Sequence, residues 1–233
     1  MIDETKLIAV ETSGQIGRIA LACGGRVLAE RDIASGMRHG QELLPVMDEA
    51  VRSLGWPPEG IGLVALSAGP GSFTGLRLAV MFARTFCWQT GARAILVPTL
   101  RVVAENASAD RATVAVLADA QRGGVYWATY ARGGDGALVR TSAEAVSPPE
   151  DVAAQLPGDI LVIGTGLERY GDLFGPRERA AADLWHPRAS VVAELAWAMH
   201  LRGEHTPADR LEPLYVRRPA PEEVWERRQR GGR

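Results

Sequence analysis

Three strand patterns follow one another within the first 33 residues, and this close spacing restricts the fold more than any other feature of the sequence. Residues 6–11 (KLIAVE) form a short apolar run that ends in a carboxylate. Residues 16–23 and 26–33 each alternate in polarity, and Gly24-Gly25 between them suits a hairpin turn that requires positive φ. Three strands joined by short turns predict an antiparallel meander at the start of the chain.

Helices and strands alternate after the meander. The apolar spacing predicts helices over 41–54 and 74–90 and strands over 61–67 and 93–97. The resulting order, β-β-β-α-β-α-β, is the layout of a ribonuclease-H-like domain, an α/β sheet with mixed strand directions.

The second half of the chain repeats this pattern. Residues 114–131 align with residues 6–23 at an offset of 108 (114 minus 6), which places Val116 on Ile8, Asp119 on Glu11 and Ala128 on Ala20. The second copy continues with a strand near 137–141, a helix near 150–156, a strand at 160–164 and a helix over 189–201. We therefore expect two ribonuclease-H-like domains, residues 1–105 and residues 106–233, with a basic tail at the end of the second.

Charge and cysteine content exclude several classes of protein. The 26 Lys and Arg residues are balanced by 28 Asp and Glu residues, so the net charge of −2 provides no general field for nucleic acid. Cys23 and Cys87 have no CxxC or CxxH spacing, which excludes a disulfide framework and a cysteine-based zinc site. The start MIDETK lacks the basic segment of a signal peptide, and the uncharged stretch 60–76 is too short for a bilayer span. The sequence therefore predicts a cytoplasmic protein without a membrane anchor.

The segment GPGSFTGLR, residues 69–77, connects a predicted strand to the helix that begins near Thr74. A glycine-rich turn at a helix amino terminus presents N–H groups and a positive dipole end, which suits a phosphate group. Its spacing matches neither GxxxxGK[ST] nor GxGxxG. The alternative is an ordinary connection in which Ser72 or Thr74 caps the helix, and the sequence leaves both interpretations open.

The two predicted helices of the first domain carry more apolar surface than one sheet can cover. In the helix over 74–90, one stripe contains Leu76, Ala79, Val80, Ala83 and Cys87, and the rest includes Leu78, Met81, Phe82, Phe86 and Trp88. The helix over 41–54 has a sheet-facing stripe, Leu43, Met47, Ala50 and Leu54, and a second apolar edge at Leu44, Val46 and Val51. The excess must be covered by the neighbouring helix or by another subunit. We favour an interaction surface made by both helices.

Glu11 stands at the end of the first strand, where nucleases of the ribonuclease-H type place their first metal ligand. Two-metal hydrolysis requires several converging carboxylates, and the strand over 61–67 ends in Leu66-Ser67-Ala68 without one. The sequence therefore disfavours a nuclease and predicts that Glu11 accepts hydrogen bonds from turn amides.

A small ATP-dependent phosphotransferase of the sugar-kinase-like fold is the alternative function. Such enzymes hold phosphate and magnesium with an acid and a Gly/Ser/Thr turn, and Glu11-Thr12-Ser13-Gly14 and Asp119-Ala120 fit this pattern loosely. The only candidate adenosine clamp is Gly164-Thr165-Gly166. The four histidines, His39, His186, His200 and His205, form neither HExxH nor HxxxH, so metalloprotease chemistry lacks its ligands.

Several segments together resemble the TsaB family. They are LIAVETSG at 7–14, RHGQELLPVMDEAV at 38–51, GPGSFTGLR at 69–77, DAQRGGVYW at 119–127 and PLYVR at 213–217. The resemblance implies an actin-like, sugar-kinase-like fold built from two ribonuclease-H-like halves. It also implies a degenerate paralogue of TsaD, the subunit that transfers threonylcarbamoyl to N6 of adenosine 37 in tRNAs that read ANN codons (t6A synthesis).

The role implied by the resemblance is that of a non-catalytic subunit that binds and activates TsaD. TsaE, which binds nucleotide, is the implied further partner, and a homodimer is implied for the isolated chain. The resemblance places the contact on Leu43, Leu44, Met47, Val51, Ser72, Phe73, Thr74, Leu76, Arg77, Val80, Met81 and Arg84. It implies no catalytic residue, metal or cofactor in the chain alone, and a nucleotide only at the boundary with TsaD. Contact with tRNA is expected only indirectly or through the tail arginines, Arg217, Arg218, Arg227, Arg228, Arg230 and Arg233.

Two residues depart from the pattern of the family. Glu11 stands where an Asp is usual, and Gln121 replaces the Arg expected after Asp119-Ala120. The longer side chain of Glu11 weakens any cation-binding geometry at that position further.

Overall fold

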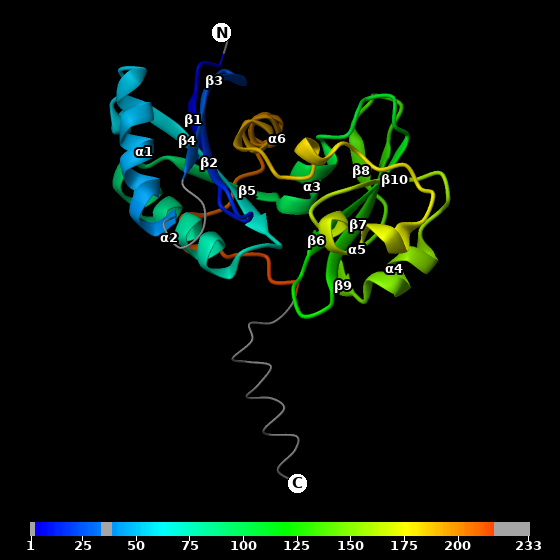
Figure 1. Ribbon diagram of the computed structural model, residues 1–233. Helices are drawn as coiled ribbons and strands as arrows, with labels where there is room; N and C mark the ends of the chain where they lie inside the picture. The colour runs from blue at the N-terminus through cyan, green and yellow to red at the C-terminus, as the bar shows by residue number, and fades with distance from the viewer. Residues whose placement is uncertain (1–2, 34–38, 217–233) are drawn as a thin grey trace, which may run out of the picture.

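A computed structural model of the chain describes residues 3–33 and 39–216. Its first sheet contains β1 (Lys6–Glu11), β2 (Gly17–Cys23), β3 (Arg26–Ile33), β4 (Ile61–Gly69) and β5 (Arg93–Pro98) (Figure 1). The spatial order is β3-β2-β1-β4-β5. The first three strands pair antiparallel, whereas β4 is parallel to β1 and β5 is parallel to β4. This is the mixed sheet of a ribonuclease-H-like domain, and the predicted meander is confirmed.

Helices cover both faces of the first sheet. On one face lie α1 (His39–Ser53) and α2 (Phe73–Thr90), and on the other lie α3 (Thr99–Ala104) and α6 (Ala189–Leu201). Successive residues of β1 enter different cores, because side chains alternate along a strand: Ile8 packs on the α1 and α2 side, whereas Leu7 packs on the α6 side. The two predicted helices of this half begin and end within two residues of their expected positions.

The second sheet contains β6 (Thr113–Asp119), β7 (Val125–Arg132), β8 (Leu138–Arg140), β9 (Ala145–Ser147) and β10 (Leu161–Ile163). Its order is β10-β6-β7-β8, with β9 also paired to β7, and α4 (Pro149–Gln155) and α5 (Gly166–Tyr170) cover its outer face. Short 3-10 turns occur at η2 (Pro58–Gly60), η3 (Gly171–Phe174), η4 (Ala182–Leu184) and η5 (Ala208–Arg210). Among the helices that the structure describes, none is both long and apolar enough for a bilayer span.

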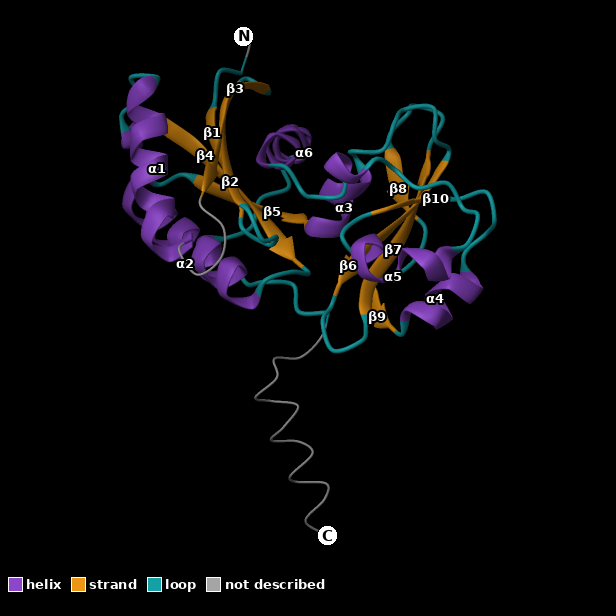
Figure 2. Cartoon of the chain, in the orientation of Figure 1, coloured by secondary structure: helices purple, strands orange, loops and turns teal. Residues whose placement is uncertain are grey.

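The strand directions of the second sheet repeat those of the first. The β6, β7 and β8 strands pair antiparallel in sequence, and β10 is parallel to β6, as β4 is to β1. In Figure 2 the layers follow one another as α1 and α2, the first sheet, α6 and α3, the second sheet, and finally α4 and α5. The predicted actin-like, sugar-kinase-like architecture of two ribonuclease-H-like halves is confirmed.

The pairing register corrects one detail of the predicted repeat. Ile8 pairs with Leu21 in the first sheet, whereas Val116, which matches Ile8, pairs with Ala128 in the second. Ala128 therefore takes the place of Leu21 and not that of Ala20. The cause is the turn: residues 12–17 separate Glu11 from its partner Arg18, but only residues 120–124 separate Asp119 from its partner Val125.

Helix α6 lies on a different sheet from the one that the repeat suggested. It was expected to complete the second domain, yet Val192, Ala193 and Ala196 pack against β1, β2 and β5 of the first sheet. All strands of the first sheet precede residue 105 and all strands of the second follow it. We keep the division at residue 105 as a proposal for the strands, with α6 counted with the first sheet.

Candidate functional site

Glu11 is fully buried at the end of β1, and its carboxylate holds the following turn. Oε1 accepts hydrogen bonds from the Ser13 backbone N–H (2.6 Å) and hydroxyl (2.5 Å), and Oε2 accepts one from the Ser67 hydroxyl at the end of β4. Burial raises the pKa of Glu11 above its usual value, although the hydrogen bonds from Ser13 and Ser67 act in the opposite direction. The prediction that Glu11 accepts hydrogen bonds from turn amides is confirmed.

The GPGSFTGLR segment packs directly on this turn. The Ser72 N–H donates to the Ser13 carbonyl (2.7 Å), and the Thr12 hydroxyl donates to the Gly75 carbonyl (2.8 Å). A Cβ on Gly75 would lie only 1.9 Å from the Thr12 carbonyl oxygen, so only glycine permits this approach. Ser72 caps α2 by accepting from the Gly75 N–H (3.2 Å), which confirms the capping interpretation and selects Ser72 over Thr74. The glycines serve contact between two backbone segments, which disfavours the phosphate interpretation.

The turn after β6 matches the turn after β1: its carboxylate also accepts a hydrogen bond from a turn amide, and a glycine also packs against backbone nearby. Asp119 is exposed and accepts from the Gln121 N–H (2.8 Å). A Cβ on Gly164 would lie 2.2 Å from the Leu117 carbonyl oxygen, so the Gly164-Thr165-Gly166 segment packs against the backbone of β6. In the part of the chain that the structure describes, no three His, Cys, Asp or Glu side chains are placed to hold a metal ion.

The predicted contact residues of α1 and α2 divide into a buried and an exposed group. Leu43, Met47, Val51, Leu76 and Val80 are buried against the first sheet. Ser72, Phe73, Thr74, Arg77 and Arg84, together with Leu44 and Met81, are exposed. The buried group forms the core beneath the helices, so a direct contact with a partner is open only to the exposed group.

Three large apolar side chains of these helices extend into solvent. Leu44 on α1 is 60% exposed, and Met81 and Trp88 on α2 are 68% and 82% exposed. Met81 and Trp88 are seven residues apart and therefore lie on the same face of α2. We call Leu44, Met81 and Trp88 the α1–α2 surface; α1 and α2 form the layer farthest from the second sheet in Figures 1 and 2.

The carboxyl-terminal segment of the same chain occupies the first turns of α2. The Phe73 and Tyr215 rings lie 5.6 Å apart, the Arg77 guanidinium stacks on Phe73, and Arg77 Nε donates to the Tyr215 hydroxyl (3.1 Å). Arg84 Nε donates to the Leu211 carbonyl (3.1 Å). Three of the predicted contact residues therefore already have partners within the chain.

The segment after α6 has a role that no pattern in the sequence predicted. Thr206 N–H donates to the Ala94 carbonyl at the edge of the first sheet, and Leu214 N–H donates to the Ala68 carbonyl. Leu211 is fully buried. The available signal was the run Pro213-Leu214-Tyr215, whose apolar side chains need cover although they follow the last predicted helix. The tail arginines expected to approach tRNA lie outside the described residues.

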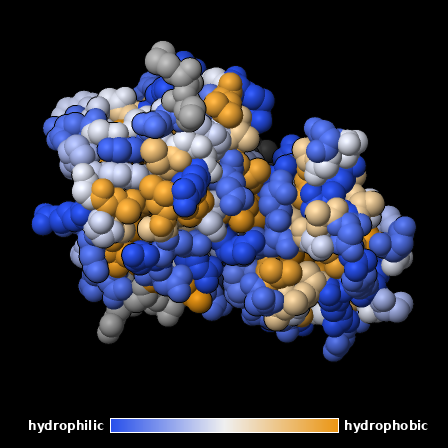
Figure 3. Space-filling model, turned by 90° about the horizontal axis from the view of Figure 1, so that it is seen from above, coloured by the Kyte–Doolittle hydropathy of each residue, from blue (hydrophilic) through white to orange (hydrophobic). Residues whose placement is uncertain are grey.

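Apolar side chains also occur elsewhere on the surface. On the face seen in Figure 3, orange groups are separated from one another by hydrophilic side chains and lie over both halves of the molecule. Leu173 and Val139 of the second half are exposed in the same way as the α1–α2 surface. The α1–α2 surface differs from these single residues, because its three exposed side chains belong to two helices that pack on each other.

Known proteins share both the sequence and the fold. The family model described as TsaD, tRNA N6-adenosine threonylcarbamoyltransferase, matches residues 32–163, more than half of the chain. The "tRNA threonylcarbamoyladenosine biosynthesis protein TsaB" of Escherichia coli is 30% identical over 219 residues, which cover 91% of this chain and 94% of that protein. The chain belongs to the TsaB family. The TsaB protein of Haemophilus influenzae is 27% identical and covers 91% of this chain and 93% of its own length.

A solved structure of a relative has the same fold. YeaZ from Pseudomonas aeruginosa superimposes with a TM-score of 0.81 at 29% identity, over 91% of this chain and 99% of that one. The resemblance to the TsaB family is therefore confirmed by sequence and by structure.

Proposed function

We propose that this chain takes part in t6A biosynthesis as a non-catalytic subunit that binds and activates TsaD. The single observation that carries the proposal is the α1–α2 surface, where Leu44, Met81 and Trp88 are exposed although the core beneath them is complete. The names of the TsaB relatives and the match to the TsaD family model support the pathway.

The energetics favour a protein partner for this surface. Full burial of a large apolar side chain contributes about 1.5–3 kcal/mol, so three such side chains provide a substantial part of a specific interface. Phe82 and Phe86 of α2 are half-buried, with ring centroids 5.5 Å apart, and add partly exposed aromatic area on the same helix. A paralogue with the same pair of helices would offer a matching face, and a second copy of this chain would compete for it.

The geometry of the two turns supports a non-catalytic role. A phosphotransferase would need Glu11 to face magnesium or phosphate, whereas both of its carboxylate oxygens accept hydrogen bonds from Ser13 or Ser67. Gly75 packs on the Thr12 carbonyl in the turn after β1, and Gly164 packs on the Leu117 carbonyl of β6, so both glycines serve contacts between backbone segments. We place no nucleotide in the chain alone and propose one only at the boundary with TsaD.

Calorimetric titration with the cognate TsaD tests the docking proposal. We expect Leu44→Asp or Met81→Asp to weaken the complex at least about tenfold, because each places an unpaired charge in an apolar interface. Leu173→Asp is the matched control: it introduces the same charge at an exposed apolar residue of η3 and should leave the affinity unchanged. No complex, or a complex insensitive to both changes, would contradict the proposal.

Two further measurements address the alternative function and the oligomeric state. Titration of the isolated chain with ATP and magnesium should give no binding heat, and saturable binding would favour a phosphotransferase. Light scattering after size exclusion should show a homodimer that TsaD converts to a heterodimer, and Met81→Asp should convert the homodimer to a monomer. TsaE is proposed as a further partner of the resulting complex.

A further inference from the structure

Three ionisable side chains, one from the amino-terminal segment and two from the end of α6 and the residues after it, form a hydrogen-bonded network beside the first sheet. Asp3 Oδ2 lies 3.1 Å from His200 Nε2, and His200 Nδ1 lies 2.9 Å from His205 Nε2. The His200 side chain is buried beside the Trp197 ring, whereas Asp3 and His205 are partly open to solvent. These hydrogen bonds connect the amino-terminal segment, α6 and the segment over 202–216 that follows α6, which we call the strap.

The order of donors and acceptors fixes the tautomer of both histidines. Because the Asp3 carboxylate can only accept, neutral His200 carries its proton on Nε2 and accepts at Nδ1. His205 must then donate through Nε2, which leaves Nδ1 of neutral His205 as a bare acceptor. Protonation of His205 changes Nδ1 into a charged donor and leaves its hydrogen bond to His200 intact.

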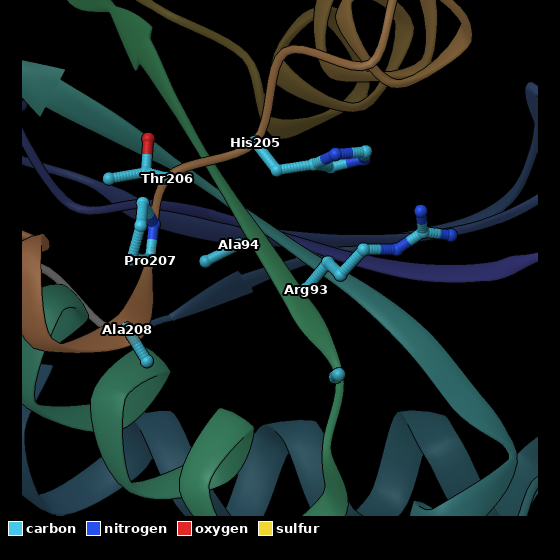
Figure 4. A pocket seen from close by; sticks show the side chains of 7 residues that line it. Arg93, Ala94, His205, Thr206, Pro207 and Ala208 are labelled. Atoms are coloured by element: carbon cyan, nitrogen blue, oxygen red, sulfur yellow. The ribbon is translucent and has the colours of Figure 1, made fainter.

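His205 and Arg93 line one hollow of about 240 Å3. Ala92, Ala94, Thr206, Pro207 and Ala208 form the rest of its wall. Figure 4 shows the Arg93 and His205 side chains extending in the same direction from β5 and the neighbouring strap. Within residues 3–33 and 39–216, neither the Arg93 guanidinium nor Nδ1 of His205 has a hydrogen-bond partner, so both can bind a ligand.

The charges around His205 favour an anion in this hollow. Burial and the positive charge of Arg93 on β5 lower the pKa of His205, and a charge on His200 of α6 would lower it further, while Asp3 reaches His205 only through His200. An anion between Arg93 and His205 would remove the repulsion between their two positive charges. A planar guanidinium with several donors binds phosphate oxygens in pairs, and an imidazolium adds one more charge-assisted hydrogen bond.

The geometry points to a phosphate-binding site formed by Arg93 and His205, in which His205 takes up a proton when the anion binds. The Asp3–His200 pair holds the His205 ring in place, so Asp3 and His200 are positioning residues. The site lies on β5 and the strap and shares no residue with the α1–α2 surface, so the inference does not depend on the proposed function.

Histidine ring signals of the full chain, recorded by NMR, test the inference. Sulfate is the main probe because its charge is constant over the pH range in which histidine titrates; chloride balances the ionic strength, and His205→Asn assigns the signal. We expect sulfate and inorganic phosphate to shift the His205 signal saturably and to move its titration midpoint to higher pH. Chloride should have no such effect, because it screens charges without forming the paired contacts.

Two variants and two further ligands sharpen the test. Arg93→Gln should weaken sulfate binding about tenfold or more, whereas Arg31→Gln, a change at an exposed arginine of β3, should not. His205→Asn should remove the pH dependence of sulfate binding. AMP that binds as well as phosphate or better assigns the site to a phosphate group of a larger molecule, and weaker binding assigns it to free phosphate; both outcomes support the inference. It is overturned if the shift does not saturate, if Arg93→Gln and Arg31→Gln behave alike, or if acetate binds as tightly as phosphate.

Discussion

A single carboxylate, Glu11, joins the end of β1 and its turn to the end of β4, which follows 56 residues later. It lies at the end of β1, holds Ser13 of the adjoining turn and receives the Ser67 hydroxyl from the end of β4. Gly75 brings a third segment, the start of α2, against the same turn. A substitution of Glu11 therefore tests the role of charge in this turn, and a substitution of Gly75 tests the role of side-chain volume.

The raised pKa of Glu11 has a consequence for stability against pH. In the unfolded chain the pKa of Glu11 is about 4.5. The folded protein retains the Glu11 proton to a higher pH than this. The stabilisation from this group is therefore complete below pH 4.5 and is lost as the pH rises through the folded-state pKa. Glu11→Gln lacks this pH-dependent stabilisation. The unfolding free energy of the variant, measured relative to that of the wild type, should therefore increase as the pH rises.

Urea unfolding across the acid and neutral range measures this difference. Asp119→Asn, at the matching exposed position of β6, is the control and should not reproduce the trend. A constant difference between Glu11→Gln and the wild type at all pH values would show that Glu11 carries no raised pKa.

Gly75→Ala tests the close approach of α2 to the first turn. The new Cβ would fall 1.9 Å from the Thr12 carbonyl oxygen, so the helix start must move. We expect a loss of about 1–3 kcal/mol in unfolding free energy, despite the better helix propensity of alanine. Gly40→Ala, in α1 with open space around it, should be neutral or slightly stabilising in the same thermal or urea unfolding assay. Equal effects of the two substitutions would refute the steric argument.

At the scale of single elements, one arginine determines how α4 ends. Arg177 donates to four carbonyl oxygens: Pro157 (2.8 Å) through Nε, Phe174 (3.1 Å) through Nη1, and Ala153 (2.9 Å) and Leu156 (2.6 Å) through Nη2. The last carbonyls of a helix lack partners within the helix, so this side chain provides a cap that joins α4 to η3. The spacing of residues around 149–177 gives no signal for such a cap.

Arg177→Ala should cost about 2–4 kcal/mol in unfolding free energy, because several backbone acceptors lose a charged donor at once. Arg177→Lys should recover only part of the loss, since an ammonium group cannot reach four carbonyls in a planar arrangement. Arg169→Ala, which removes an arginine stacked on Tyr170, should change stability by less than about 0.5 kcal/mol. Urea unfolding checks all three, and a full rescue by lysine would contradict the capping role.

At the scale of the whole molecule, α6 makes the first sheet depend on a segment that follows the second. The chain completes β6 to β10 before α6 returns to cover β1, β2 and β5. Asn106 strengthens the connection, since its amide donates to the Leu184 and His186 carbonyls and its oxygen accepts from Arg188. The strands of the two sheets therefore follow one another along the chain, whereas the core of the first half is completed by a helix that comes after the second sheet.

A buried charge in α6 should destabilise the first sheet before the second. Val192→Asp places a carboxylate in the core between α6 and the first sheet, at an expected cost of about 3 kcal/mol or more. Hydrogen exchange should then show protection lost in β1 and β2 ahead of β6 and β7. Leu201→Asp, at the exposed end of the same helix, should leave both sheets protected. Faster exchange in β6 first would show that α6 belongs with the second sheet.

The sequence by itself determined the types and order of the main elements, the sheet-facing stripes of α1 and α2, and the mixed strand directions. These features depend on periodicity and on short connections, and both are local. It also identified the resemblance to the TsaB family, because whole segments such as GPGSFTGLR carry it. The short α3, α5 and β9 were not predicted, since elements of so few residues contain less than two periods of any pattern.

Only the tertiary structure decided which sheet α6 covers, because its apolar residues suit either sheet. It also decided the pairing of Ala128 with Val116, which depends on the length of a turn. The hydrogen bond between Asp3 and His200 spans nearly the whole chain, and no local pattern links two such positions. Contacts of this kind depend on where the backbone returns, and packing of the complete core decides that path.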